Sequence, residues 1–228
     1  MSKFKKKHAI FDLADTILTM AVSRERIAQD ILLESGLAVS APHIKTAFRI
    51  VEKLFPVPSG KKEDEKSLRD FYYSRNENFF EELGLFKSRT LLAKQLYARI
   101  KSQKKWQVSQ DFLTYSKFLR KNDVKIGIIS NWDKSFPSII IEHGLNTLTD
   151  FNESSFDIGY EKPDIRIFEA VFKKHSINRK EAFYVGNDYV MDIIPCLKLG
   201  VDSVLIDREG NYSNADCRTV RKLTELMV

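Results

Sequence analysis

The stretch KHAIFDLADT, residues 7–16, decides the fold. A short apolar run ends abruptly at Asp12, and a second carboxylate, Asp15, and a hydroxyl, Thr16, follow it. A run of this length bounded by polar residues is typical of a buried strand. In open α/β sheets, ligands bind beyond the carboxyl ends of the strands. Asp12 is therefore our first candidate functional residue, and the residues at the ends of the later strands are the next candidates.

Apolar runs and helical periodicity alternate after Trp106. We predict strands at 125–129, 156–160, 182–185 and 203–206. We predict helices at 110–121, 135–142, 164–175, from the end of 182–185 to Gly200, and near 217–226. Helices and strands that alternate at this spacing form βαβ units, which favour a parallel, doubly wound α/β sheet.

Residues 18–105 show only helical periodicity. We predict helices at 19–35, 41–55, 67–83 and 88–102, with stop signals at Gly36, Pro56 and Gly84. The first strand therefore stands alone before an all-helical stretch. We expect one α/β core, residues 1–17 and 106–228, interrupted by a helical insert at 18–105.

Polar residues follow each predicted strand except the last. Ser130 and Asn131 follow 125–129, and Lys162 follows 156–160. The strand 182–185 leads into Gly186, Asn187 and Asp188, with Asp192 four residues later. Carboxyl ends of parallel strands meet at one edge of a sheet, so these side chains are predicted to form one site.

These motifs resemble those of the haloacid dehalogenase-like (HAD) hydrolase superfamily, which read DxDx[TV], a Ser or Thr ending the second strand, a Lys, and GDxxxxD or GDxxxD. Their counterparts are DLADT at 12–16, ISN at 129–131, EKPD at 161–164 and GNDYVMD at 186–192. The stretches WQV, ISNWD and KPDIRIF (from 106, 129 and 162) are most similar to the subgroup related to rhythmically expressed gene products. The resemblance implies a Rossmann-like core and makes the insert the family's helical first cap domain.

The resemblance also implies a chemistry. Asp12 would be the nucleophile that forms an aspartyl-phosphate, while Ser130 and Lys162 would hold phosphoryl oxygens and Asn131 would contact the substrate. The expected cofactor is Mg²⁺, which takes carboxylates, waters and substrate phosphate. Its ligands would be Asp12, the carbonyl oxygen of Ala14 and the polar side chains of the fourth motif. The candidates in that motif are Asn187, Asp188 and Asp192.

The sequence departs from the family pattern at two positions. The usual Gly-Asp of the fourth motif is Gly186-Asn187, so that either the amide oxygen of Asn187 or the displaced Asp188 would serve the metal. The family's general acid/base stands two residues after the nucleophile, where this chain has Ala14. Positioned proton transfer is worth about 10²–10⁴-fold, so alkyl phosphates are expected to be poor substrates.

Three functions remain open at this level. The first is a phosphatase acting on a small phosphorylated metabolite with a good leaving group, such as an acyl or aryl phosphate. The second is a non-catalytic HAD-fold binding protein, because a fold by itself does not imply activity. The third is hydrolysis of a carbon–halogen or carbon–phosphorus bond, since relatives with those activities also lack the acid.

Composition bounds the remaining expectations. With 43% hydrophobic and 30% charged residues, the chain has a globular rather than a disordered composition. Two cysteines without metal spacing, no secretory pattern and no long apolar span lead us to expect a reduced, cytoplasmic protein without a membrane partner. The net charge of +6 suits a small anionic substrate, and we do not expect nucleic acid as a partner. The oligomeric state is left open.

Overall fold

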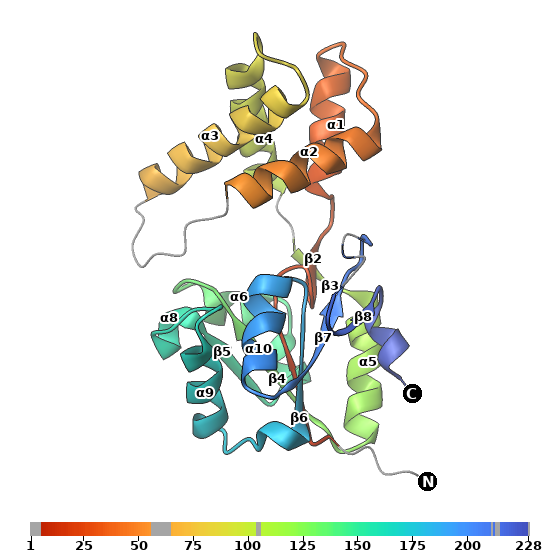
Figure 1. The fold of residues 1–228 in the computed structure, drawn as a ribbon, viewed down its shortest axis with the longest axis vertical. Coiled ribbons are helices and arrows are strands. Elements are labelled where there is room, and N and C mark those ends of the chain that lie inside the picture. The colour runs from red at the N-terminus through yellow and green to blue at the C-terminus, as the bar shows by residue number, and fades with distance from the viewer. Residues whose placement is uncertain (1–5, 56–64, 104–105, 211, 213–214, 228) are drawn as a thin grey trace. The chain divides into compact units, whose positions relative to one another are not determined.

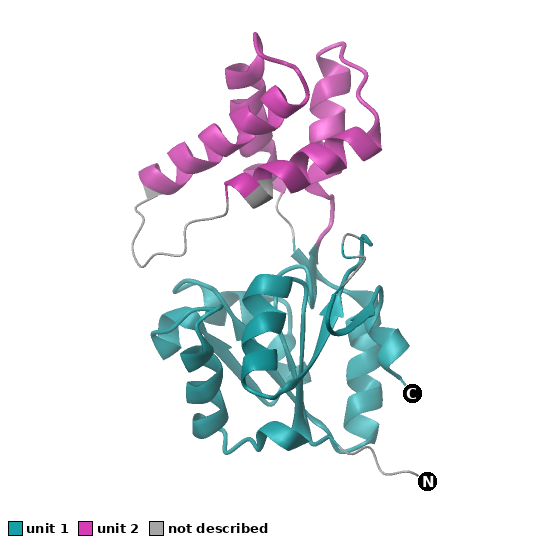
Figure 2. Cartoon of the chain, in the orientation of Figure 1, with its two compact units in different colours: residues 1–19, 106–228 teal, residues 20–105 magenta. Residues whose placement is uncertain are grey.

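The computed structural model describes residues 6–55, 65–103, 106–210, 212 and 215–227. The chain divides into two compact units (Figure 2). Unit 1 comprises residues 1–19 and 106–228, and unit 2 comprises residues 20–105.

Unit 1 contains a six-stranded sheet with the strand order β5-β4-β1-β6-β7-β8. The strands are β1 (His8–Phe11), β4 (Lys125–Ser130), β5 (Phe151–Ser154), β6 (Ala182–Gly186), β7 (Asp202–Ile206) and β8 (Arg218–Val220). All five pairings between neighbouring strands are parallel. After β1, the chain adds β4 and β5 on one side of β1 and then β6, β7 and β8 on the other, so the strand order reverses at β1. The predicted doubly wound parallel sheet is confirmed, and β1 lies at its switch point.

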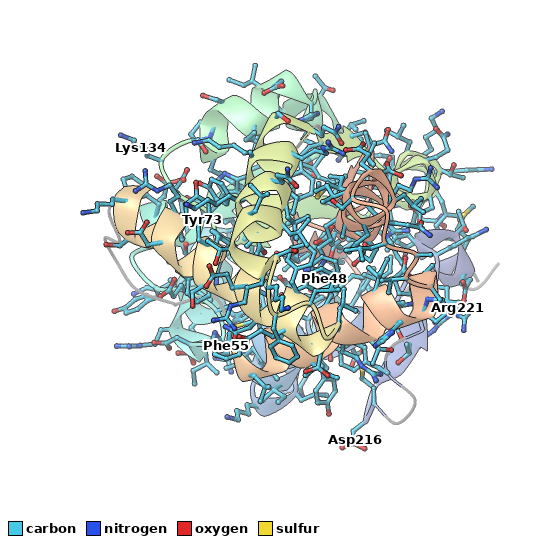
Figure 3. The ribbon with its side chains drawn as sticks, turned by 90° about the horizontal axis from the view of Figure 1, so that it is seen from above. Phe48, Phe55, Tyr73, Lys134, Asp216 and Arg221 are labelled. Atoms are coloured by element: carbon cyan, nitrogen blue, oxygen red, sulfur yellow. The ribbon has the colours of Figure 1, made fainter. Side chains whose placement is uncertain are left out.

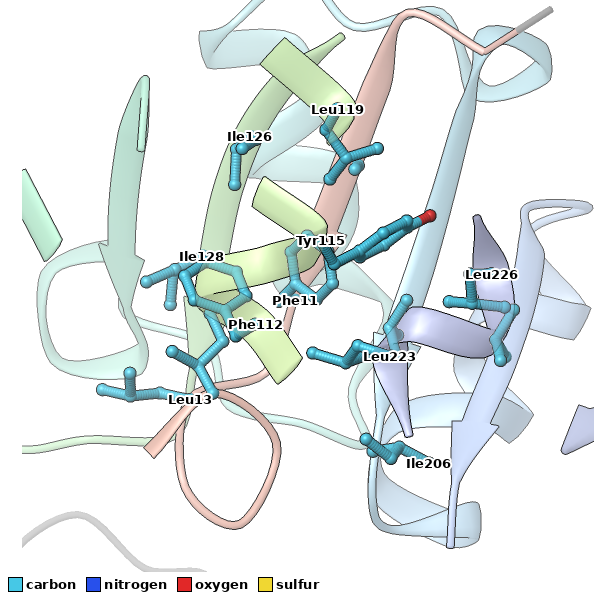
Figure 4. Packing of buried hydrophobic residues seen from close by; sticks show 14 of the residues in the cluster. Phe11, Leu13, Phe112, Tyr115, Leu119, Ile126, Ile128, Ile206, Leu223 and Leu226 are labelled. Carbon is cyan, nitrogen blue, oxygen red and sulfur yellow. The ribbon is translucent and has the colours of Figure 1, made fainter. Parts of the chain in front are cut away.

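Helices cover both faces of this sheet (Figure 1). One face packs against α5 (Gln110–Lys121), α6 (Phe136–Glu142), α7 (Leu145–Leu148) and the terminal 3₁₀ turn η3 (Leu223–Leu226). The other face packs against α9 (Ile165–Lys174) and α10 (Ile194–Lys198). On the first face, Phe11 meets Phe112 and Tyr115 of α5 edge to face (Figure 4). Because alternate strand residues point to opposite faces, Ile10 belongs to the other core.

Unit 2 contains four helices: α1 (Arg24–Glu34), α2 (Ala41–Leu54), α3 (Glu65–Glu82) and α4 (Arg89–Gln103). Ser23 caps α1 by accepting a hydrogen bond from the backbone of Arg26. The core of the unit centres on Phe48 of α2 (labelled in Figure 3), whose ring stacks on Phe79 with 4.0 Å between centroids. Within the described residues, no helix combines the length and the apolar character needed to cross a bilayer.

The chain passes between the units through a small second sheet that the sequence pattern did not predict. Strand β2 (Leu18–Met20) pairs with β3 (Trp106–Val108). The helix predicted at 19–35 therefore begins only at Arg24. Both strands are three residues long, too short for a period-2 pattern to stand out beside the helical periodicity after β2.

Two further predicted elements were wrong. The strand expected at 156–160 is the short helix α8 (Ser155–Ile158), and the strand of that βαβ unit is β5, which lies directly before α8. Ser154 caps α8 by accepting a hydrogen bond from Asp157 N, which ends the strand. The helix predicted near 217–226 is β8 followed by η3. Its apolar residues were too few to distinguish the two structures by periodicity.

Candidate active site

Asp12 lies directly after β1 and is 6% exposed. One of its carboxylate oxygens, Oδ1, accepts a hydrogen bond from Lys162 Nζ at 2.6 Å and one from Ser130 Oγ at 3.2 Å. Ser130 is the last residue of β4, and Lys162 lies in the loop between α8 and α9. Three residues that are distant in the chain thus meet around one carboxylate oxygen.

Asn131 fixes the loop that carries Lys162. Its Nδ2 donates to the Lys162 carbonyl oxygen, and its Oδ1 accepts from the Lys162 backbone N, both at 2.8 Å. This reciprocal pair joins the end of β4 to the loop before α9. The interaction aligns the backbone from which the ammonium group reaches Asp12.

A second carboxylate, Asp192, holds the other side of the ammonium group. Asp192 Oδ1 lies 2.6 Å from Lys162 Nζ, and its Oδ2 accepts from Asp188 N at 3.0 Å. Asp192 belongs to the π-helical turn η2 (Tyr189–Ile193), which follows β6. Gly186, the last residue of β6, makes room for it, because a Cβ there would lie 2.3 Å from Asp192 Cγ. The glycine of the fourth motif is therefore a packing requirement.

Tyr184 completes this cluster. Its hydroxyl lies 3.2 Å from Lys162 Nζ and 3.1 Å from both Asp192 Oδ1 and the Ile129 carbonyl oxygen. Sequence reasoning treated Tyr184 only as part of an apolar strand. The signal was available, because residues of β6 alternate between faces and a buried Tyr hydroxyl needs a polar partner.

Burial and charge set the protonation of this cluster. Burial raises the pKa of Asp12 to about 6, with the negative charge of Asp192 acting in the same direction and the charge of Lys162 opposing both. Burial alone would lower the pKa of Lys162. However, the charges of Asp12 and Asp192 outweigh that effect and hold its pKa above the ordinary value. The site therefore keeps a fixed positive charge between two carboxylates.

The loop after β1 turns tightly at Asp15. Asp15 has a φ of 57°, in the left-handed region, and its backbone N donates to the Leu18 carbonyl oxygen. Thr16 Oγ1 donates to Asn187 Oδ1 at 3.2 Å, which brings the loop after β6 to the loop after β1. Ala14 is the residue before Asp15, and it offers only a methyl group at the position where the family pattern has a carboxylate. Asp15 is exposed, so it does not fill that gap.

Asp188 has a different role from Asn187. Its side chain caps η2 by accepting hydrogen bonds from Val190 N and Met191 N. Both oxygens of Asp192 are likewise engaged inside the cluster. Within the described residues, no three acidic, His or Cys side chains are placed to hold a metal together. The loops after the neighbouring strands β1 and β6 also carry the Ala14 carbonyl oxygen and the Asn187 amide oxygen, and the latter accepts a hydrogen bond from Thr16. One carboxylate with neutral oxygens and waters is a donor set that fits Mg²⁺.

The sequence-derived site residues thus fall into two groups. Asp12, Ser130, Lys162 and Asp192 form one buried cluster, with Asn131 supporting it through the backbone of Lys162. Ala14 and Asn187 lie in the two loops beside that cluster, joined through Thr16, while Asp188 faces the backbone of its own turn.

This arrangement of strand-end residues belongs to a known family. The sequence profile of the haloacid dehalogenase-like hydrolases matches residues 9–206, and the chain is a member of that family. A zebrafish relative, haloacid dehalogenase-like hydrolase domain-containing protein 3, is 25% identical over 215 residues, covering 91% of this chain and 88% of the relative. The fruit-fly rhythmically expressed gene 2 protein is 28% identical over 100 residues, covering 42% of this chain and 38% of the relative.

Shorter similarity extends to a phosphatase. The glyceraldehyde 3-phosphate phosphatase of Methanothermobacter thermautotrophicus is 29% identical over 104 residues, covering 43% of this chain and 44% of the relative. Among solved structures, magnesium-bound YfnB of Bacillus subtilis has a TM-score of 0.65 at 18% identity, covering 97% of this chain and 96% of YfnB. A HAD phosphatase of Thermococcus onnurineus has a TM-score of 0.58 at 22% identity, covering 96% and 95% of the two chains. These structural similarities confirm the predicted HAD fold.

Proposed function

We propose that this protein is a phosphatase that forms an aspartyl-phosphate on Asp12. The observation that carries the proposal is the placement of Lys162 Nζ 2.6 Å and Ser130 Oγ 3.2 Å from the same oxygen of Asp12. An ammonium group and a hydroxyl at these positions can hold phosphoryl oxygens while the carboxylate attacks phosphorus. Similarity to a curated phosphatase adds support.

The proposed reaction has two steps. An oxygen of Asp12 forms a bond to phosphorus, and the bond from phosphorus to the leaving oxygen breaks. Water then attacks the phosphorus of the aspartyl-phosphate, which releases inorganic phosphate and restores the carboxylate. Asp192 and Tyr184 keep the Lys162 ammonium in place throughout, and Asn131 acts through the backbone of Lys162.

Mg²⁺ is the proposed cofactor, supported by the oxygen donors that Asp12 and the loops after β1 and β6 offer and by the magnesium-bound neighbour YfnB. Asp12, the Ala14 carbonyl oxygen and the Asn187 amide oxygen would hold it. When bound, it supplies positive charge that offsets the charge of the phosphoryl group. Asp188 and Asp192 serve the turn and the ammonium group instead.

Ala14 narrows the proposed substrates. Without a carboxyl group at this position, the leaving oxygen must depart without a positioned proton donor. Acyl and aryl phosphates leave as weakly basic anions, so they need no such donor. We therefore propose a small acyl or aryl phosphate as the substrate, with unit 2 acting as the cap that selects it.

A substrate comparison tests this function. Purified protein with Mg²⁺ is assayed for phosphate release from acetyl phosphate, 4-nitrophenyl phosphate and glycerol 3-phosphate. We expect the first two to be hydrolysed and the third to be about 10²–10⁴-fold slower. Asp12→Asn should abolish turnover, while the matched change Asp123→Asn, at the end of α5, should not. Hydrolysis of none of the three, or full activity of Asp12→Asn, would refute the proposal.

A binding protein is the second candidate, and Ala14 is the observation that favours it. Such a protein would bind a phosphorylated molecule at Lys162 and Ser130 without releasing phosphate. Calorimetric binding of acetyl phosphate with no turnover, in both the wild type and Ala14→Asp, would support this function over the first. Turnover of acetyl phosphate by the wild type would exclude it.

A further inference from the structure

A cavity lies in unit 1 on the sheet face that carries α5. It has a volume of about 640 Å³ and opens beside the first residues of β7 and the strand β8. Its apolar lining includes Phe183, Val204 and Leu226. We name it the β7–β8 cavity. Its volume falls within the range of small-molecule sites, which are mostly apolar with a few placed polar groups.

Two hydroxyl groups in this lining have no partner among the described residues. Ser203 Oγ is fully buried and makes no hydrogen bond. Tyr115 is 1% exposed, and within the described part of the chain its hydroxyl makes no hydrogen bond either. Figure 4 shows this hydroxyl pointing away from Phe11 and Phe112, on the side of Leu226. An unsatisfied buried hydroxyl costs about 1–3 kcal/mol, so Ser203 Oγ indicates a missing hydrogen-bonding partner. The Tyr115 hydroxyl is a second donor in the same lining.

A positive charge stands at the edge of the same cavity. Arg218 lines it and is exposed, and its Nη2 donates only to the Glu225 carbonyl oxygen. No carboxylate of the described residues forms an ion pair with Arg218, whereas Lys6, the other lining cation, is paired with Asp202 at 2.5 Å. Burial raises the pKa of the Tyr115 hydroxyl and the charge of Arg218 opposes that rise, so the two groups lie within electrostatic reach. Arg218 is the cation available to a ligand.

We propose that the β7–β8 cavity binds a small carboxylate with an apolar ring or branched chain. The apolar body contacts Phe183, Val204 and Leu226, while the carboxylate accepts hydrogen bonds from the two hydroxyls and pairs with Arg218. Each orphan hydroxyl then gains a charged acceptor, and such bonds are stronger than those between neutral groups.

This site is separate from the proposed active site. Ser203 is the second residue of β7, near its amino end, whereas Asp12 and Ser130 lie at the carboxyl ends of parallel strands. The lining shares no residue with the Asp12 cluster. Binding here is therefore tested without any assay of phosphate release.

The test is a titration of the ¹⁵N-labelled full chain, followed by amide chemical shifts. The probes are 3-phenylpropanoate and its uncharged analogue 3-phenylpropanamide. We expect saturable shifts for residues 200–204 and 217–218 with the carboxylate, at a Kd of about 1 mM or below for a ligand of this size. The amide should bind at least about tenfold more weakly because it lacks the charge that pairs with Arg218.

Variants separate this site from nonspecific binding. Arg218→Gln should raise the Kd of the carboxylate about tenfold and remove its preference over the amide. Ser203→Ala and Tyr115→Phe should each raise the Kd severalfold without emptying the core. Arg221→Gln, at an exposed arginine outside the lining (labelled in Figure 3), should change nothing.

Three outcomes would overturn the proposal. Wild-type protein without saturable shifts at residues 200–204 would show that the cavity does not bind the carboxylate. Equal affinities for the carboxylate and the amide would exclude recognition of the charge. Equal losses in Arg218→Gln and Arg221→Gln would reduce the effect to general surface charge.

Discussion

The two sides of the Asp12 site are built differently. On the Lys162 side, every charged group is buried and paired: Lys162 with Asp12 and Asp192, each at 2.6 Å. On the side of the β1 loop, Ala14 and Asn187 stand where the family pattern has carboxylates, and a single side-chain hydrogen bond of 3.2 Å joins Thr16 to Asn187. The groups proposed to hold a phosphoryl group thus meet at Asp12, whereas the position proposed to assist the leaving group carries only the methyl group of Ala14.

This difference determines how much a substitution on each side should lower the free energy of unfolding. Removing one member of a buried ion pair leaves an uncompensated charge in a low-dielectric environment. A single substitution of Lys162, Asp12 or Asp192 should therefore destabilise the folded protein. Ala14 carries no charge and makes no polar side-chain contact. Substitution at residue 14 can therefore test the proposed leaving-group chemistry without removing a member of the buried ion pairs of Lys162.

The largest effect is expected at Lys162. Lys162→Met should lower the free energy of unfolding by about 3–5 kcal/mol, because Asp12 and Asp192 lose their shared counter-ion, and it should abolish phosphate release. Denaturant unfolding measures the first effect. Lys7→Met, which removes an exposed partner of Glu181, should cost at most about 1 kcal/mol.

A double variant tests the cause of that loss. Adding Asp192→Asn to Lys162→Met should recover part of the stability, because one of the two unpaired charges is removed. An additive loss in the double variant would contradict the charge explanation.

Ala14→Asp tests the side of the β1 loop, where the carboxylate of the family pattern is absent. A carboxyl group at this position should raise turnover of glycerol 3-phosphate by about 10²–10⁴-fold and that of acetyl phosphate much less, since only the former needs a proton donor. Steady-state kinetics on the two substrates measures the contrast. Ala14→Asn, equal in size but unable to donate an acidic proton, serves as the control and should produce no selective gain. A uniform gain on both substrates would argue against a missing acid.

The protonation of Asp12 gives a prediction for pH. Its pKa of about 6 in the metal-free protein lies above the ordinary value of 3.8, so the folded state favours the neutral acid. The contribution of Asp12 to stability is therefore fully present below about pH 3.8 and is lost as the pH rises through about 6.

Carboxyl ¹³C NMR of metal-free protein measures this titration directly. Asp192→Asn should lower the pKa of Asp12, because the negative charge of Asp192 raises it. Asp123→Asn should leave it unchanged. A titration of Asp12 near pH 4 in the wild type, or no decrease in Asp192→Asn, would contradict the assigned cause.

The smallest effect is expected at Asp15. Its φ of 57° is unfavourable for a residue with a side chain, so Asp15→Gly should stabilise the protein by at most about 1 kcal/mol. Asp15→Val should destabilise it, because a β-branched residue tolerates this conformation worst. Thermal unfolding of the two variants measures the sign, and the opposite order would show that the contacts of the Asp15 side chain outweigh its backbone strain.

The proposed nucleophile could be located in advance because a strand end is a local feature. The apolar run before Asp12 is visible in the sequence, and parallel topology requires that the ends of β1, β4 and β6 meet. Lys162 was found by its motif, although the strand assigned before it was wrong. The error did not affect its position because α8 and the loop still return the chain to the same edge of the sheet.

The contacts among these residues could not be derived in the same way. The sequence offered Asn187 and Asp188 as equal metal ligands, but they make different contacts. Asp188 caps η2, and Asn187 meets Thr16, because the π-helical turn after β6 sets the direction of each side chain. The same turn directs Oδ1 of Asp192 towards Lys162, while its Oδ2 accepts from the backbone N of Asp188.

Apolar runs and motif spacing along the chain were enough to predict a parallel sheet and the residues at its carboxyl edge, but they did not locate the strands β5 and β8. They were also enough to show that residue 14 lacks a carboxylate. The folded structure was needed to show that Tyr184 joins Lys162 to Asp192, and that Tyr115 and Ser203 line one cavity without partners among the described residues. Hydrogen bonds between residues that are distant in the chain, and the burial of their side chains, depend on side-chain direction. The periodicity of the sequence does not report that direction.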